Sequence, residues 1–441
     1  MYKISIAATV AIAGCSLANC AAAAQTNGFL EDSKVSVSSR TMYYDADTRE
    51  GAANDQRETA QGFRFDYSSG FTTGTLGFGV DVQAVTGIHL DGGPGHHPDN
   101  NSFFPSDHDG SALDSWSRLG ANGKFRLSKT ELVVGSALAP NIPVLLTNDG
   151  RLLPQSFEGG MLTSREIENV TLVAGQIEHV ASRASSNSTG LAVSGGTQES
   201  NQFRFGGADW RVTKDLMLQY YHANLQNYYS QDFLGLVHLL PISEGQSFKT
   251  DIRYFDSRSD GKNGDAGYQF NNNGGYAKTP GKVDNDTWSA MFTYSLGGHS
   301  FMLGRQQVSG SGGFVYLNQG SLPNEGNGGT SFYSFTDSMV SGFVRAGEKT
   351  SFGQYSYDFA AVGVPGLRAS VAYLSGDDIK DAAGRAHQSE WERDMRVDYV
   401  IQTGVFKGLG TSLRQGLYRG DTSLADQNQT RLIVNYTYNF M

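Results

Sequence analysis

The sequence predicts an all-β protein, a single antiparallel β-barrel that crosses a membrane. Three observations predict this fold class: an export signal at the start, alternation of apolar and polar residues along most of the remaining chain, and a composition rich in glycine and aromatic residues. The 441 residues include 55 Gly, 25 Phe and 21 Tyr but only 10 Pro. Such a composition is typical of many strands with aromatic faces joined by glycine-containing turns.

The first segment, residues 1–24, is predicted to be a cleaved signal peptide. It has an early cation, Lys3, followed by an apolar run and small residues before the cleavage site, as secretory signals do. The alternative is a lipoprotein signal in IAGC (12–15), cleaved so that the mature chain starts at Cys15. Cleavage after residue 24 leaves the barrel domain, residues 25–441, without a cysteine, so disulfides, zinc–thiolate sites and thiol nucleophiles are excluded.

Strand patterns recur from residue 35 to the end of the chain, each with one apolar and one polar face. The clearest are VSVSSRTMYY (35–44), GFRFDY (62–67), TLGFGVDVQA (75–84), SFKTDIRYF (247–255), LRASVAY (367–373), MRVDYVIQ (395–402) and RLIVNYTYNFM (431–441). In the last of these, Ile433 is the one apolar residue out of phase. A soluble sandwich would bury the apolar faces in a core, whereas a membrane barrel turns them toward lipid and leaves the polar faces to line a lumen.

The lengths of the connections alternate, as in outer-membrane barrels. Short connections such as 68–74 and 295–299 interleave with long polar ones such as 91–114 and 256–284, which indicates short periplasmic turns and long external loops. One strand with its loop takes about 23 residues, which predicts roughly 16 to 18 strands of roughly 9 to 11 residues. The mean hydropathy of −0.36 is compatible with this fold because the two faces of a strand average out.

Several stretches, spread in order over the chain, match a known family. They are GFLEDS (28–33), SGFTTGTLGFGVD (69–81), RLSKTEL (126–132), GRLLPQSFEG (150–159), GVPGLRASVAYLSGDDI (363–379), YVIQTG (399–404) and RLIVNY (431–436). In these stretches the chain resembles the OprD-type porins, also called outer-membrane carboxylate channels. The resemblance implies an 18-stranded barrel with an inward-folded third loop, for which residues 138–155 are the candidate, and a row of cations along one wall that guides carboxylates. The chain departs from the family at Met441, one residue beyond the expected terminal aromatic, and at Asp398 and Ser412, where lumen cations are common.

Twelve cations are candidates for this basic row. Eleven fall on the polar side of predicted strands and one lies in the third loop. They are Arg40, Arg64, Arg118, Lys124, Arg126, Lys249, Arg253, Arg368, Arg396, Arg414 and Arg431 on strands, and Arg151 in the loop. Along a lumen they would bind carboxylates weakly at many positions, so that a solute can leave. The alternative for a strand cation is a structural ion pair with a lumen acid such as Asp66, Asp81, Asp251 or Asp398; for Arg151 it is a hydrogen bond to loop carbonyls.

Other chemistry finds little support. Residues 91–110 hold three histidines and several aspartates, but their spacing is irregular and no strand fixes their geometry, so we expect a mobile external loop. Residues 256–267 lack the spacing and the final glutamate of a calcium loop. No G-x-S-x-G, H-E-x-x-H or P-loop motif is present. We therefore predict no catalytic residue, no cofactor and no metal site.

The functional prediction is a porin, not an enzyme, for passive uptake of small carboxylates, either amino acids or aromatic and other organic acids. Its expected partners are outer-membrane lipid and lipopolysaccharide, the solutes, and the barrel assembly machinery, in a monomer or a loose homotrimer. The net charge of −10 argues against nucleic acid. Two alternatives remain: an outer-membrane barrel enzyme such as a protease or lipase, and a secreted soluble β-protein that binds carbohydrate.

Overall fold

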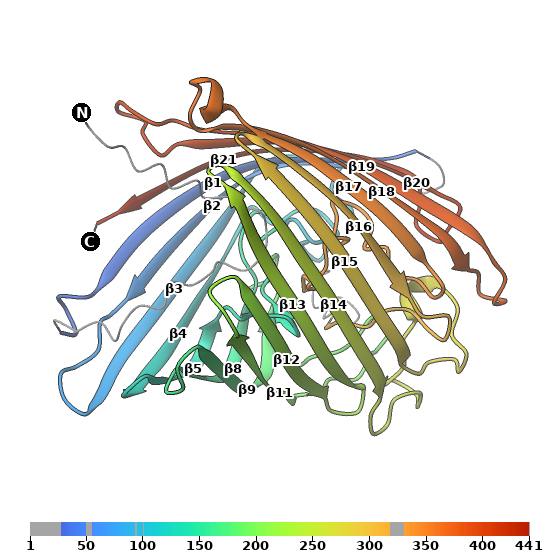
Figure 1. Ribbon diagram of the computed structural model, residues 1–441, viewed down its shortest axis with the longest axis horizontal. Coiled ribbons are helices and arrows are strands. Elements are labelled where there is room, and N and C mark those ends of the chain that lie inside the picture. The colour runs from blue at the N-terminus through green and yellow to red at the C-terminus, as the bar shows by residue number, and fades with distance from the viewer. Residues whose placement is uncertain (1–27, 50–54, 93–94, 100, 318–329, 441) are drawn as a thin grey trace.

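The computed structural model describes residues 28–49, 55–92, 95–99, 101–317 and 330–440. The predicted signal peptide, residues 1–24, lies outside these ranges, so its cleavage stays a prediction. In the described part of the chain, 18 long strands form one closed antiparallel sheet (Figure 1). The 18-stranded barrel that the family resemblance implied is therefore confirmed.

Every barrel strand pairs with its neighbours along the chain. The strands are β1 (Lys34–Thr48), β2 (Gln56–Ser68), β3 (Leu76–Asp91), β4 (Ser115–Leu127), β5 (Thr130–Leu138), β8 (Ser156–Ser164), β9 (Val170–Ala181), β11 (Phe203–Arg211), β12 (Leu216–Leu225), β13 (Tyr229–Ser243), β14 (Gln246–Ser259), β15 (Asp284–Leu296), β16 (His299–Val308), β17 (Lys349–Asp358), β18 (Leu367–Lys380), β19 (Ala386–Val400), β20 (Gly410–Gly420) and β21 (Gln427–Asn439). The last strand, β21, pairs with β1 over its whole length, and the two lie side by side in Figure 1. This pairing closes the barrel, so that each of the 18 described barrel strands has a neighbour on both sides.

Short elements occupy some of the connections. They are β6 (Asn141–Ile142) and β7 (Leu145–Leu146), which pair with each other, β10 (Ser188–Thr189), which pairs with β9, and the 3-10 helices η1 (Asn272–Gly274) and η3 (Phe359–Val362). At the periplasmic end, β15 and β16 are joined by two glycines, and Gly297 has a φ of 55°. A left-handed residue is what so tight a turn requires, and glycine adopts that conformation without steric cost.

The period of two places the residues of each strand as the sequence predicts. In β21, Leu432 and Tyr438 are 41% and 52% exposed on the outer face, whereas Arg431 is 5% exposed on the lumen face. Ile433, the residue out of phase, also faces inward and packs with Met42 of β1 and with Leu152. An apolar lumen residue is tolerated there because a folded-in loop covers it.

Several strands are longer than predicted. The expected length was roughly 9 to 11 residues, the number that crosses the hydrocarbon core, whereas β3 has 16 residues and both β1 and β13 have 15. Strand pairing continues beyond the membrane because hydrogen bonding between neighbours satisfies the backbone equally well in water.

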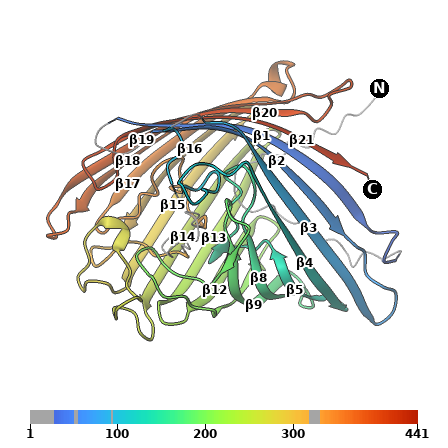
Figure 2. The same ribbon diagram turned by 180° about the vertical axis from the view of Figure 1, so that it is seen from behind.

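Four of the external connections contribute many of the buried residues inside the barrel, where Figure 2 shows loop segments enclosed by the ring of strands. We name them L2 (92–114), L3 (139–155), L4 (182–202) and L7 (309–348). Their buried apolar residues include Phe103 and Phe104 in L2, Leu145, Leu152 and Leu153 in L3, Leu191 and Val193 in L4, and Phe314, Val315, Phe332 and Phe343 in L7. The predicted inward folding of L3 is confirmed, but the sequence analysis did not anticipate that L2, L4 and L7 also fold in.

Candidate functional site

All eleven predicted strand cations lie on the lumen side of their strands. Successive side chains of a strand point to opposite faces, and the residues directly before and after each cation face outward. Half of the twelve candidates form ion pairs with acids of the barrel wall. The pairs are Arg64–Asp66 at 2.6 Å, Lys124–Asp81 at 2.7 Å, Lys249–Asp251 at 3.2 Å, Arg253–Asp251 at 2.8 Å, Arg368–Asp358 at 2.9 Å and Arg396–Asp398 at 2.6 Å. The sequence analysis gave a structural ion pair with a lumen acid as the alternative to a role in the basic row. The structure contains such an ion pair for each of these six cations.

Arg118 of β4 ties two loops to the barrel wall. Its guanidinium donates to the backbone carbonyls of Ser182 at 2.7 Å and Ser185 at 2.9 Å in L4, and to that of Pro154 at 2.7 Å in L3. The donors of Arg118 are thus used to position loops.

Near the periplasmic end, the Arg126 guanidinium lies 4.3 Å from the ring centroid of Phe71.

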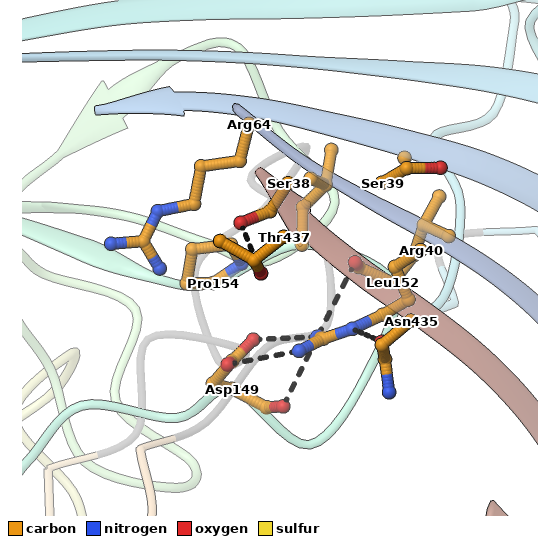
Figure 3. A pocket seen from close by; sticks show the side chains of 11 residues that line it. Ser38, Ser39, Arg40, Arg64, Asp149, Leu152, Pro154, Asn435 and Thr437 are labelled. Atoms are coloured by element: carbon orange, nitrogen blue, oxygen red, sulfur yellow. Dashed lines mark hydrogen bonds and ion pairs between the residues drawn. The ribbon is translucent and has the colours of Figure 1, made fainter. Parts of the chain in front are cut away.

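Arg40 of β1 fixes L3 against the wall (Figure 3). Its Nη1 and Nη2 donate to the two carboxylate oxygens of Asp149 at 2.7 and 3.2 Å, and its Nε donates to Oδ1 of Asn435 at 3.0 Å. Below this clamp lies a pocket of about 240 Å³, lined by Arg40 and Arg64 together with Ser38, Thr437 and part of L3. The pocket is a widening of the lumen between L3 and strands β1, β2 and β21.

Three arginines form a row across the last three strands. Arg396 of β19 faces Arg414 of β20, and Arg414 faces Arg431 of β21. Directly opposed residues have Cβ atoms about 4.5–5.5 Å apart, and like charges in such positions destabilise a sheet. Because barrel strands tilt by roughly 35–45°, this row climbs the wall obliquely. Its energetic cost to folding points to a role other than stability.

Two arginines of this row, Arg414 and Arg431, form a group with two loop arginines, Arg151 of L3 and Arg183 of L4; we call these four residues the basic cluster. The charges of Arg151, Arg183 and Arg414 all act on Arg431. Within the described residues, none of the four has a carboxylate at ion-pair distance; their partners are neutral. Arg183 Nη1 donates to Asn148 Oδ1 at 3.0 Å, Arg414 Nε to Ser412 Oγ at 3.1 Å, Arg431 Nη2 to the Met339 carbonyl at 2.8 Å, and Arg151 lies 4.8 Å from the Tyr44 ring centroid.

The cluster carries positive charge that the nearby loops only partly offset. Burial and the charge of Arg151 lower the pKa of Arg183 to about 9, so this guanidinium remains protonated at pH 7. Asp337 of L7 is attracted by Arg183 and Arg431, but burial is the larger influence and raises its pKa to about 6. A single L7 carboxylate, ionised only above about pH 6, thus faces several guanidinium groups.

A group of acids lies on the lumen face of β19, above Arg396. Glu390, Glu392 and Asp394 are held by L7: Ser341 Oγ donates to Glu390 at 2.8 Å, the Ser341 N–H donates to Glu392 at 2.7 Å, and Ser338 Oγ donates to Asp394 at 2.6 Å. Arg345 pairs with Glu390 at 2.6 Å. These contacts fix L7 across the lumen and place an acidic wall beside the basic cluster.

Sequence reasoning missed several of these residues. The acids of β19 occupy alternate positions in EWERD (390–394), a local signal that could have placed them on one face. Arg183 and Asp337 lie in loops without periodicity, so no sequence pattern could have found them.

The structure corrects the expectation for residues 91–110. Phe103 and Phe104 are fully buried, and His97 Nδ1 lies 2.7 Å from Glu58 Oε2, to which His89 Nε2 also comes within 3.2 Å. Strands β2 and β3 supply Glu58 and His89, so the prediction that no element fixes the geometry of this loop was wrong.

Comparisons with known proteins agree with this architecture. The family model described as outer membrane porin, OprD family, matches residues 27–440. Porin D of Pseudomonas aeruginosa is 33% identical over 430 residues, covering 94% of this chain and 92% of that protein. The porin-like protein GalP of Pseudomonas putida is 30% identical, with 94% and 93% coverage.

Solved structures extend the agreement to three dimensions. The crystal structure of Pseudomonas aeruginosa OccK8 (OprE) has a TM-score of 0.85 at 43% identity, and that of Pseudomonas aeruginosa OpdK with vanillate has 0.82 at 32% identity. Both alignments cover 94% of this chain and 100% of the other. The chain is thus a β-barrel of the bacterial outer membrane, and it belongs to the OprD family of outer membrane porins.

Proposed function

We propose that this porin is selective for small solutes that carry a carboxylate, and that the basic cluster of Arg151, Arg183, Arg414 and Arg431 draws them through the constriction. The observation that carries the proposal is the set of guanidinium groups without a carboxylate partner in the described lumen. Burying like charges together opposes folding, so an anion supplied from outside is the partner that suits them. Vanillate, seen with the relative OpdK, is an aromatic carboxylate.

The remaining arginines would continue the path toward the periplasm. Arg40 faces Asn435, four residues nearer the periplasmic end of β21 than Arg431, and Arg64 faces Ser38, two residues further along β1. Both are already paired, with Asp149 and Asp66 respectively, so they would hold a carboxylate less strongly than the cluster does. A weaker site on the exit side favours release.

The energy of each step fits passive transport. A carboxylate 4 Å from a guanidinium gains about 1 kcal/mol in bulk water and more where the lumen is drier. Several such steps raise the local anion concentration without trapping the solute. The acids of β19 on the adjacent wall, together with Asp337 of L7, would suit solutes that also carry a cationic group, so amino acids remain candidates beside aromatic and other organic acids.

A panel of uptake assays tests the proposal. Proteoliposomes containing the purified porin should take up benzoate several times faster than benzamide, which has the same shape without the charge. Arginine, alanine and benzoate compared at equal concentration would identify the preferred class. Equal rates for benzoate and benzamide would refute carboxylate selectivity and leave a general diffusion pore.

We also propose that β21 serves as the signal for the barrel assembly machinery. Tyr438 and Phe440 are 52% and 59% exposed on the outer face, and their rings lie 4.8 Å apart in an edge-to-face arrangement. Aromatic residues in such positions meet the interfacial region of the bilayer. Lipid and lipopolysaccharide would surround this face in the assembled porin.

A further inference from the structure

Two histidines and a glutamate converge beneath L2, two strands from Arg431 of the basic cluster: Glu58 faces Tyr44 of β1, and Tyr44 faces Arg431 of β21. Glu58 of β2 and His89 of β3 face the lumen near the external end of their strands, and His97 reaches them from L2. The nearest nitrogens, His89 Nε2 and His97 Nδ1, lie 3.2 and 2.7 Å from the same carboxylate oxygen, Glu58 Oε2. All three atoms lie within 4.8 Å of one another.

We propose that Glu58, His89 and His97 form a Zn²⁺ site at the external mouth of the barrel, with water as the fourth ligand. Imidazole nitrogen and carboxylate oxygen are ligands that zinc prefers, at about 2.0–2.2 Å. In a tetrahedral site with such bonds, ligand atoms lie about 3.4 Å apart. The observed separations require only small side-chain adjustments to reach this value.

The outer contacts of the site are those of metal-binding histidines. His97 Nε2, the nitrogen that faces away from Glu58, lies 3.0 Å from Ser106 Oγ. The second oxygen of Glu58 accepts a hydrogen bond from Gln56 Nε2 at 2.6 Å. Partners of this kind fix the orientation of a ligand and raise its basicity.

L2 is held in the conformation that places His97. Oδ1 of Asn101 accepts from the N–H groups of Phe103 at 2.8 Å and Phe104 at 3.0 Å, and the Phe103 ring stacks on that of Tyr44 at 5.5 Å. The loop therefore presents its ligand without having to order itself on binding, which reduces the entropic cost of coordination.

The charge balance also favours a cation. The Glu58 side chain is 0% exposed, and those of His97 and His89 are 6% and 17% exposed. Within the described residues, no lysine or arginine pairs with Glu58. A buried carboxylate is costly without a compensating charge, and a divalent ion would supply it while leaving both imidazoles neutral. The partial exposure of His89 opens this side of the site to solvent.

Metal titration tests this site in the full-length porin. The purified protein, stripped with EDTA, is titrated with Zn²⁺ against a fluorescent chelator, and the expected stoichiometry is one ion per chain. His89→Ala, His97→Ala and Glu58→Gln should each weaken binding at least tenfold, because loss even of an outer-shell partner costs about 10–100-fold. The control is His108→Ala, an exposed histidine of the same loop, which should bind as the wild type does.

A second measurement does not depend on how the variants fold. Co²⁺ in place of Zn²⁺ should give the strong visible absorption of a four-coordinate site in the wild-type porin. Heat-modifiable mobility in gels would establish that each variant still forms a barrel. Absence of this absorption in the wild type would overturn the proposal. Wild-type affinity in both folded histidine variants, or loss of binding in His108→Ala, would do so too, since either would indicate an adventitious surface site.

Discussion

Replacing Arg414 and Arg431 together by glutamine removes two members of the basic cluster that face each other on β20 and β21. Neither has a carboxylate partner within the described residues, so no acid is left without its cation. Glutamine retains hydrogen-bonding capacity toward Ser412 and the Met339 carbonyl, the present partners of these arginines. The change therefore alters the charge of the lumen more than its structure.

The expected effect follows from the geometry. Opposed residues on neighbouring strands are about 5 Å apart at Cβ, so a passing carboxylate can interact with both guanidinium groups at once. Each contributes about 1 kcal/mol at 4 Å in bulk water. Two such contributions total about 2 kcal/mol, screening by salt lowers this total, and a loss of about 1.4 kcal/mol corresponds to a factor of ten. Carboxylate uptake should then fall about tenfold, whereas the open-channel conductance should persist, since lumen substitutions mainly tune selectivity.

Paired measurements test this prediction: single-channel conductance in planar bilayers, and benzoate uptake into proteoliposomes at low and at high salt. The double variant Arg414→Lys and Arg431→Lys should retain most of the uptake. Lys249→Gln is the matched control, because it removes a lumen cation while Asp251 keeps its second partner, Arg253. If the glutamine variant took up benzoate at the wild-type rate in low salt, the two arginines would be structural and the reasoning would be refuted.

Three further predictions concern a loop acid, a loop brace and the terminal strand. Burial raises the pKa of Asp337 to about 6, so this carboxylate loses its negative charge as the pH falls from 7 to 5. Anion selectivity, measured from reversal potentials, should therefore rise over this pH range. Asp337→Asn should abolish the rise. An unchanged pH response in that variant would assign it to other groups. Arg118→Met leaves three loop carbonyls without their donor and should lower the free energy of unfolding, measured by urea titration, by about 3 kcal/mol. L3 and L4 should also become sensitive to protease. If the variant resisted protease as the wild type does, Arg118 would not brace these loops. Phe440→Asp places a charge on the lipid-facing side and should reduce the amount of heat-modifiable barrel in outer-membrane fractions; wild-type levels would contradict the proposed assembly signal.

The sequence by itself determined the fold class, the faces of the strands and the family. Side-chain direction in a strand has a period of two, which is a local property, so a run such as RLIVNY already places Arg431 on the lumen face and Leu432 toward lipid. The same rule placed Arg414 correctly and would have placed Glu390, Glu392 and Asp394 on one face. The loop L3 was predictable only through the family resemblance, because its own residues carry no periodic signal.

The tertiary structure alone decided which lumen cations are paired and which are not. Pairing depends on the register between strands and on loop contacts between residues far apart in the chain, such as Arg40 with Asp149, and no local pattern encodes either. It also brought Arg183 and Asp337 to the basic cluster, and it joined Glu58, His89 and His97 from two strands and a loop. Loops follow the space left inside the barrel, and that space exists only once 18 strands have closed.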